Sequence, residues 1–156
     1  MIGSKGGYDI FLGGTTNKTT WRDTFIHYMS EKDPKIKCFN PVVENWTAQC
    51  IELENFVKMH SKYHVYVLTP RMRGAYSIAE MIDSVHDKTK KVYIYIYDED
   101  IDDDGNVIKW DLQMKNSLNV ISNMIITHGG HVAKSLNELI SMIAEDHKST
   151  PVLRHL

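Results

Sequence analysis

The run VYIYIY, from Val92 to Tyr97, is apolar or aromatic at every position. A strand with one face in water alternates polar and apolar residues, whereas a strand covered on both faces is apolar throughout. Doubly covered strands belong to parallel sheets that carry helices on both sides. The run therefore predicts a buried strand in an α/β domain.

Further strands and helices alternate along the chain. Strands are expected at residues 8–12, 36–39, 65–69 and 131–133. Helices are expected at about 20–33, 47–61, 77–86, 111–128 and 135–146, although the stretch NMIIT at 123–127 also suits a strand. This alternation is typical of right-handed βαβ units. We predict a flavodoxin- or Rossmann-like doubly wound sheet, mostly parallel, of about five strands with helices on both faces.

The length of 156 residues suits one domain. We expect that domain at 8–147, with a flexible leader at 1–7 and a surface tail at 148–156. A net charge of −2 and a pI near 6.4 give no basic surface for nucleic acid, and no stretch is long enough to span a membrane. Cys38 and Cys50 lack metal or disulfide spacing, so we expect reduced thiols, a cytoplasmic protein and no cofactor.

Glu80 stands where a strand, a turn and a helix follow one another, and two interpretations apply to it. Ser77-x-x-Glu80 matches a capping box, in which both side chains only close the first turn of the helix. Alternatively, Glu80 projects almost opposite to the apolar stripe of this helix and can face a cleft. A carboxylate held ionised by the positive end of a helix suits a nucleophile for a sugar carbon.

Other polar groups follow the predicted strands. Gly13 and Gly14 with Thr15 can cradle a phosphate or sugar hydroxyls, or they can simply form a tight turn. Arg71 and Arg73 can bind a phosphate, or they can be solvated loop residues. Trp46 has polar neighbours and is a candidate for stacking on a base, whereas Trp21 reads as a core residue.

The acidic run from Asp98 to Gly105 resembles half of a calcium loop. Asp100, Asp102 and Asp104 have the spacing of the first ligands, and Asp111 falls at the last ligand position. A strand rather than a helix precedes the run, and the final ligand is a short Asp. We therefore prefer a solvated acidic loop and keep calcium as the alternative.

Three segments in combination resemble one family. These are YDIFLGGTT followed by Trp21-Arg22, then FNPVVENW, then the strand-turn-helix that ends in SIAE. Together they are similar to the nucleoside 2-deoxyribosyltransferase-like superfamily, in particular its small bacterial and phage-type members. The resemblance runs from Tyr8 to about Ile143 and implies a flavodoxin-like domain in a homodimer or a larger homo-oligomer, with active sites at subunit boundaries.

The resemblance implies cleavage of an N-glycosidic bond by Glu80, through a glycosyl-enzyme intermediate that passes to another base or to water. It implies substrate contacts at Gly13, Gly14 and Thr15 of the first loop and at Asn40 and Trp46 of the second. Together with neighbouring residues of the same presumed cleft, our candidate substrate-binding set is Gly13, Gly14, Thr15, Trp21, Arg22, Asn40, Trp46, Arg71, Arg73, Gly74 and Ser77. Characterised transferases place another carboxylate shortly before the nucleophile, where this chain has residues 71–74. The two arginines there favour a phosphorylated substrate. A second hypothesis is a non-catalytic module that binds or sequesters a nucleotide in the same pocket.

Overall fold

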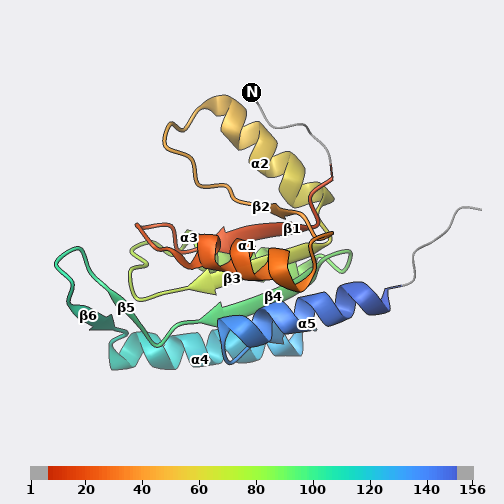
Figure 1. Cartoon of the computed structure of the whole chain (residues 1–156). Coiled ribbons are helices and arrows are strands. Elements are labelled where there is room, and N and C mark those ends of the chain that lie inside the picture. The colour runs from red at the N-terminus through yellow and green to blue at the C-terminus, as the bar shows by residue number, and fades with distance from the viewer. Residues whose placement is uncertain (1–6, 151–156) are drawn as a thin grey trace, which may run out of the picture.

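A computed structural model describes residues 7–150, so most of the predicted leader and residues 151–156 of the predicted tail lie outside the described part. Its main sheet has five strands in the order β2-β1-β3-β4-β7, and every neighbouring pair is parallel. The strands are β1 (Ile10–Gly14), β2 (Cys38–Phe39), β3 (Tyr63–Leu68), β4 (Lys91–Ile96) and β7 (His131–Val132). The predicted flavodoxin-like α/β fold is confirmed (Figure 1).

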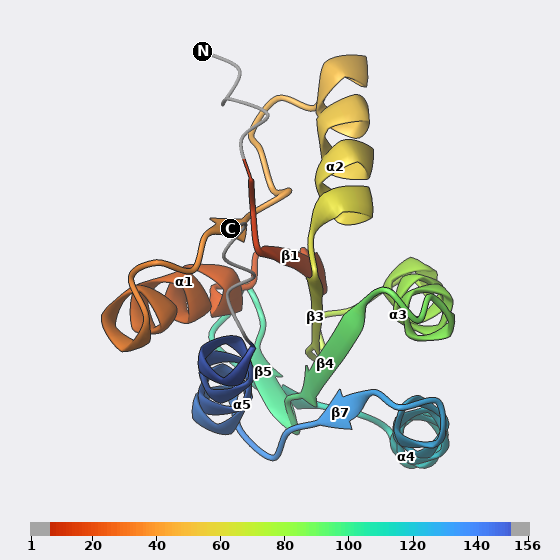
Figure 2. The ribbon, with the colours of Figure 1, turned by 90° about the vertical axis from the view of Figure 1, so that its right-hand side faces the viewer.

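Within residues 7–150, four helices cover the two faces of this sheet and a fifth lies at one end of it. They are α1 (Trp21–Lys32), α2 (Ala48–His60), α3 (Tyr76–His86), α4 (Leu112–Thr127) and α5 (Leu136–Ser149). α1 and α5 pack on one face, and α3 and α4 pack on the other (Figure 2). α2 lies at the β2 end of the sheet and adds Val57 to the second core. Because α5 ends at Ser149, the first two residues of the predicted tail are helical.

The middle of the sheet is formed by β3, which lies between β1 and β4. All six residues of β3 are buried, and β3 pairs with β1 from Ile10↔Tyr63 to Gly14↔Val67. Its other neighbour, β4, contains the VYIYIY run except Tyr97, with Val92, Tyr93 and Ile94 buried and Tyr95 and Ile96 half-buried. The order of the strands reverses between β1 and β3, and ligands of such sheets bind outside the carboxyl ends of the strands at that point.

Two stretches differ from the sequence prediction. The acidic run is not a plain loop, because β5 (Glu99–Ile101) and β6 (Val107–Lys109) form a separate antiparallel hairpin. The alternative strand at 123–127 is wrong, since α4 continues through it. That helix ends in a Schellman motif: Gly129 has φ 89°, and the Gly129 and Gly130 N–H groups donate to the Ile126 and Ile125 carbonyls.

The helix starts divide into two groups. Asp111 and Ser135 cap α4 and α5 by accepting from the N–H groups of Met114 and Glu138. The predicted Ser77 cap is wrong, because α3 begins at Tyr76 and no side chain caps it. Glu80 therefore lies one turn inside the helix rather than in a capping box. No helix within residues 7–150 is long and apolar enough to cross a bilayer.

Candidate active site

A cleft of about 560 Å³ lies at the carboxyl ends of β1 and β3. The β1–α1, β2–α2 and β3–α3 loops line it, together with Glu54 of α2 and Glu80 of α3. Most of the residues assigned from the sequence meet there, namely Glu80, Gly13, Gly14, Thr15, Arg22, Trp46, Arg73, Gly74 and Ser77. The cleft lies where the strand order reverses, as a ligand site in such a sheet should.

Glu80 is buried in the wall of this cleft and carries an ion pair that sequence reasoning missed. Its side chain is 10% exposed, and its Oε2 accepts a hydrogen bond from Lys58 Nζ at 2.7 Å. Lys58 belongs to α2, and its own side chain is 21% exposed. The pair gives the carboxylate a counter-charge, although the two residues are 22 positions apart and no local pattern joins them.

Glu54 is a second carboxyl group of the cleft that was not predicted. It stands one helical turn before Lys58 on α2, so both side chains emerge on one face. Burial raises the pKa of Glu54, and the nearby charge of Glu80 raises it further, against the opposing effect of Lys58 and Arg22. A raised pKa favours the protonated carboxyl, which can donate a proton. The i, i+4 spacing of Glu54 and Lys58 was the only signal in the sequence.

The glycines of the first loop are required by close packing. A Cβ on Gly13 would lie 2.4 Å from Cε1 of Tyr66. Gly14 has φ 115°, and a Cβ there would lie 2.1 Å from the Val67 carbonyl oxygen. Close packing against β3 therefore accounts for glycine at both positions, which lie at the end of β1 rather than in a tight turn.

Thr15 is also engaged within the protein. Its N–H donates to the Val67 carbonyl at 3.0 Å, and its Oγ1 accepts from the Thr69 N–H at 3.0 Å. The amide is therefore not free to bind a phosphate, whereas the hydroxyl, which only accepts in these contacts, can still donate its own hydrogen to a ligand.

Arg22 holds the end of β1 and the start of the first loop through hydrogen bonds to backbone carbonyls. Its guanidinium donates to the carbonyls of Leu12, Gly14 and Thr15, and it lies 4.4 Å from the centre of the Trp21 ring. Burial lowers the pKa of Arg22 to about 10, while the charges of Glu54 and Glu80 raise it. Trp21 is a core residue that donates to the Thr15 carbonyl, and it does not line the cleft.

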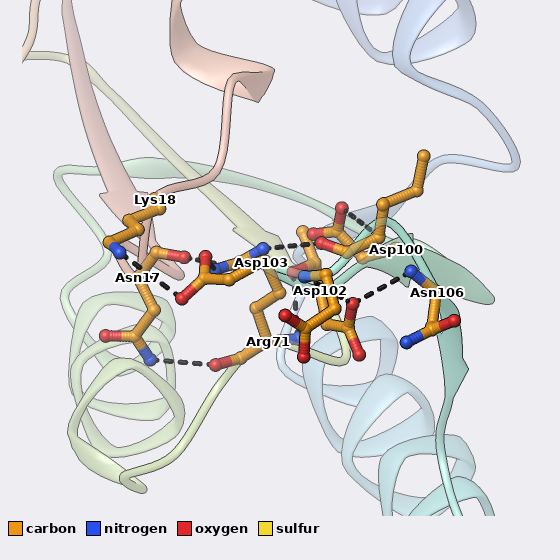
Figure 3. Close-up of polar contacts among 10 residues, drawn as sticks. Asn17, Lys18, Arg71, Asp100, Asp102, Asp103 and Asn106 are labelled. Atoms are coloured by element: carbon orange, nitrogen blue, oxygen red, sulfur yellow. Dashed lines mark hydrogen bonds and ion pairs between the residues drawn. The ribbon is translucent and has the colours of Figure 1, made fainter.

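The two predicted phosphate-binding arginines have different positions. Arg73 is exposed at the cleft and makes no hydrogen bond or ion pair within residues 7–150. Arg71 does not line the cleft, because its guanidinium reaches the β5–β6 hairpin (Figure 3). Of the two guanidinium groups, only that of Arg73 is therefore open to the cleft.

The two predicted residues of the β2–α2 loop, Asn40 and Trp46, also have different positions. Trp46 lines the cleft and is 61% exposed, which leaves its ring open for stacking. Asn40 does not line the cleft, and its side-chain oxygen accepts from the Val42 N–H. Asn40 therefore shapes the loop that presents Pro41, Val42 and Val43 to the cleft.

The calcium alternative is not supported. Within residues 7–150 there is no group of three or more His, Cys, Asp or Glu side chains that could hold a metal ion. Asp102 accepts from the N–H groups of Asp104 and Asn106 in its own turn, and Asp100 accepts from the Ile101 N–H. Asp111 caps α4. Three of the four carboxylates of the calcium alternative, those of Asp100, Asp102 and Asp111, thus accept hydrogen bonds from local backbone amides.

Comparisons with known proteins bear on the fold and the family of this chain. No curated protein matches the sequence significantly. The crystal structure of a conserved protein from Enterococcus faecalis V583 is similar, with a TM-score of 0.56 at 15% identity over 90% of this chain and 99% of that one. That likeness supports the fold alone. Residues 7–101 match the profile described as "Nucleoside 2-deoxyribosyltransferase like". The match includes all three cleft loops and covers more than half of the sequence, so the chain belongs to the nucleoside 2-deoxyribosyltransferase-like family.

Proposed function

We propose that this protein breaks the N-glycosidic bond of a nucleoside or nucleotide, with Glu80 as the nucleophile and Glu54 as the acid. The observation that carries the proposal is the meeting of two carboxyl groups in one cleft at the reversal of the strand order. A pair of carboxyl groups is what retaining glycosidic enzymes use. Membership of the family supports the same class of reaction.

The first step makes a covalent intermediate. An Oε atom of Glu80 forms a bond to the anomeric carbon C1′ while the bond between C1′ and the base nitrogen breaks. The electron pair of that bond leaves with the base, which takes a proton from Glu54. The products are the free base, a glycosyl ester of Glu80 and an ionised Glu54.

The second step releases the sugar. Water, or the nitrogen of an incoming base, attacks C1′ and gives a proton to Glu54. The ester bond breaks, and its electron pair returns to Glu80 as a carboxylate. Water gives hydrolysis, and a second base gives transfer. Both outcomes restore the starting protonation of Glu54 and Glu80.

A phosphorylated substrate suits the charges of the cleft better than an uncharged nucleoside. Arg73 is exposed in the cleft wall and has no partner in the described residues. A guanidinium binds phosphate oxygens through paired N–H donors. Trp46 offers an open ring on which a base can stack. We therefore favour a nucleotide.

A non-catalytic nucleotide-binding module is the alternative, and one observation favours it. Lys58 engages Glu80 at 2.7 Å in the free protein, so the carboxylate already has a partner. In a binding module that ion pair would persist with ligand bound, and the pocket would sense or sequester the nucleotide. In the enzyme, Lys58 would give up its contact as Glu80 becomes an ester.

The test is a search for free base by chromatography after incubation with a panel of nucleosides, nucleotides and NAD. Glu80→Gln should abolish base release, and Glu54→Gln should slow it about 10²- to 10⁴-fold, as loss of a general acid does. Glu52→Gln is the matched control, because Glu52 is an exposed carboxylate of the same helix outside the cleft. Undiminished base release by folded Glu80→Gln protein would disprove the mechanism.

The same panel separates the enzyme from the binding module. A nucleotide that raises the melting temperature, yet stays intact through long incubation with the native protein, would favour the module. Turnover of that nucleotide would exclude it.

A further inference from the structure

Arg71 joins three segments that are far apart in the sequence. Its side chain is 13% exposed although it belongs to a surface loop. Its Nε donates to the Asn17 carbonyl at 2.7 Å, its Nη1 donates to the Ile101 carbonyl, and its Nη2 donates to Asp103 Oδ1 at 2.6 Å. The guanidinium thus ties the β1–α1 loop and the β5–β6 hairpin to the start of the β3–α3 loop (Figure 3).

Asn17 returns the contact and is fixed by it. Its Nδ2 donates to the Arg71 carbonyl at 2.8 Å. A carbonyl oxygen only accepts hydrogen bonds, so the amide nitrogen must face Arg71 and the side-chain oxygen must face away, as Figure 3 shows. That oxygen has no partner within residues 7–150, and Asn17 is part of the cleft wall. Asn17 of the cleft wall therefore carries a side-chain oxygen without a partner in the described residues, and the contact with Arg71 sets which way the amide faces.

Asp103 of the β5–β6 hairpin contacts both Arg71 and the β1–α1 loop. Asp103 accepts from Arg71 and also pairs with Lys18 Nζ at 3.2 Å, and these two contacts are the main cause of its lowered pKa. Lys18 has φ 56°, a conformation that residues other than glycine rarely adopt. Asp103 lies beyond the stretch that matches the family profile, which ends at residue 101. Of the two contacts that Arg71 makes with the hairpin, the one with Asp103 therefore lies outside the matched stretch, and the one with Ile101 lies at its last residue.

We propose that Asn17 determines substrate specificity by accepting a hydrogen bond from a donor group of the substrate, and that Arg71 and Asp103 position it. The inference rests on the proposed nucleotide substrate. A 2′-deoxynucleotide such as deoxyadenosine monophosphate offers two such donors, the sugar 3′-hydroxyl and the exocyclic amine of the base. Arg71 and Asp103 touch Asn17 or its partner and not the substrate, so they are positioning residues.

The test measures equilibrium binding in Glu80→Gln protein, so that chemistry does not consume the probe. The probes are 2′-deoxyadenosine 5′-monophosphate, its 2′,3′-dideoxy analogue and its analogue without the 6-amino group. Asn17→Ala should weaken binding of the first probe about three- to tenfold, the usual worth of one neutral hydrogen bond. If the 3′-hydroxyl is the donor, Asn17→Ala should leave the affinity for the dideoxy analogue unchanged. If the amine is the donor, Asn17→Ala should leave the affinity for the analogue without the amine unchanged.

The contacts of Asn17 with Arg71 and of Arg71 with Asp103, which we call the clamp, are tested without any ligand. The measurement is hydrogen exchange of the amides at residues 16–19. Asp103→Ala should speed their exchange and weaken binding of the same probe as Asn17→Ala. Lys109→Ala is the matched control, because it removes the exposed Lys109–Glu99 pair of the same hairpin and leaves the clamp intact. It should change neither quantity.

The outcomes separate this inference from the proposed function. Equal binding of all three probes by Asn17→Ala and parent protein overturns the specificity role, as does failure of the parent to bind any of them. Unchanged exchange in Asp103→Ala overturns the clamp. Loss of probe binding in Asn17→Ala, together with no base release by native protein, overturns the enzymatic proposal and leaves the inference standing.

Discussion

Replacing Gly14 with alanine is expected to destabilise the protein and distort the first loop of the cleft. Gly14 has φ 115°, which side-chain-bearing residues avoid at a cost of about 1–3 kcal/mol. An added Cβ would also lie 2.1 Å from the Val67 carbonyl oxygen, inside any allowed contact. The strands must separate there to relieve the clash.

The size of the loss follows from what that separation breaks. The Val67 carbonyl accepts the Thr15 N–H at 3.0 Å, and such a bond contributes about 1 kcal/mol net. Together with the backbone strain, the expected loss is about 3 kcal/mol of the free energy of unfolding. For a domain of this length, that corresponds to a fall in melting temperature of roughly 6–12 °C.

Urea denaturation and thermal melting measure both quantities. Gly74→Ala is the matched control, because Gly74 lines the same cleft, has an ordinary φ and has no atom within 4 Å of an added Cβ. It should change stability by less than about 0.5 kcal/mol. If Gly14→Ala is as stable as Gly74→Ala, the argument from close strand packing is wrong.

Three further predictions concern pH and assembly. If Glu54 is the acid, the rate of base release should fall as pH rises through the elevated pKa of Glu54. The residual rate of Glu54→Gln should lack this fall at high pH, and the same fall in the variant would assign it to another group. Burial, the largest cause, lowers the pKa of His64 from 6.5 to about 4, so roughly 3 kcal/mol of stability should be lost as pH falls from 6.5 through about 4. Urea titrations of His64→Phe should lack that slope, and the same slope in both proteins would contradict the assignment. Light scattering should give at least twice the 18.0 kDa chain mass, and a strict monomer would count against a shared active site.

The sheet and its helices were predictable because each has a local cause. Continuous apolar runs marked the central strands, and the helices expected at about 111–128 and 135–146 correspond to α4 (Leu112–Thr127) and α5 (Leu136–Ser149). The β5–β6 hairpin was missed because its strands are only three residues long and its acidic side chains read as a solvated loop. Short strands with exposed residues leave little hydrophobic periodicity to detect.

The candidate site was predictable in its location and less so in its contacts. The carboxyl ends of parallel strands must meet, so Glu80 and the first loop could be placed together. The partner of Glu80 could not be predicted, because Lys58 reaches it from another helix and the packing of the two helices depends on the whole fold. Arg71 and Arg73 looked alike in sequence, and only the hairpin, which engages Arg71, separates their roles.

The way α2 is attached sets a limit on the working temperature of the proposed enzyme. α2 carries Glu54 and Lys58, yet Val57 is its only buried residue, whereas α3, which carries Glu80, has four. Elements with little buried apolar surface open locally at free energies well below that of global unfolding. On warming, α2 should therefore detach while the sheet is intact and take the acid away from the nucleophile. Catalysis would then cease at a temperature where circular dichroism still reports a folded domain.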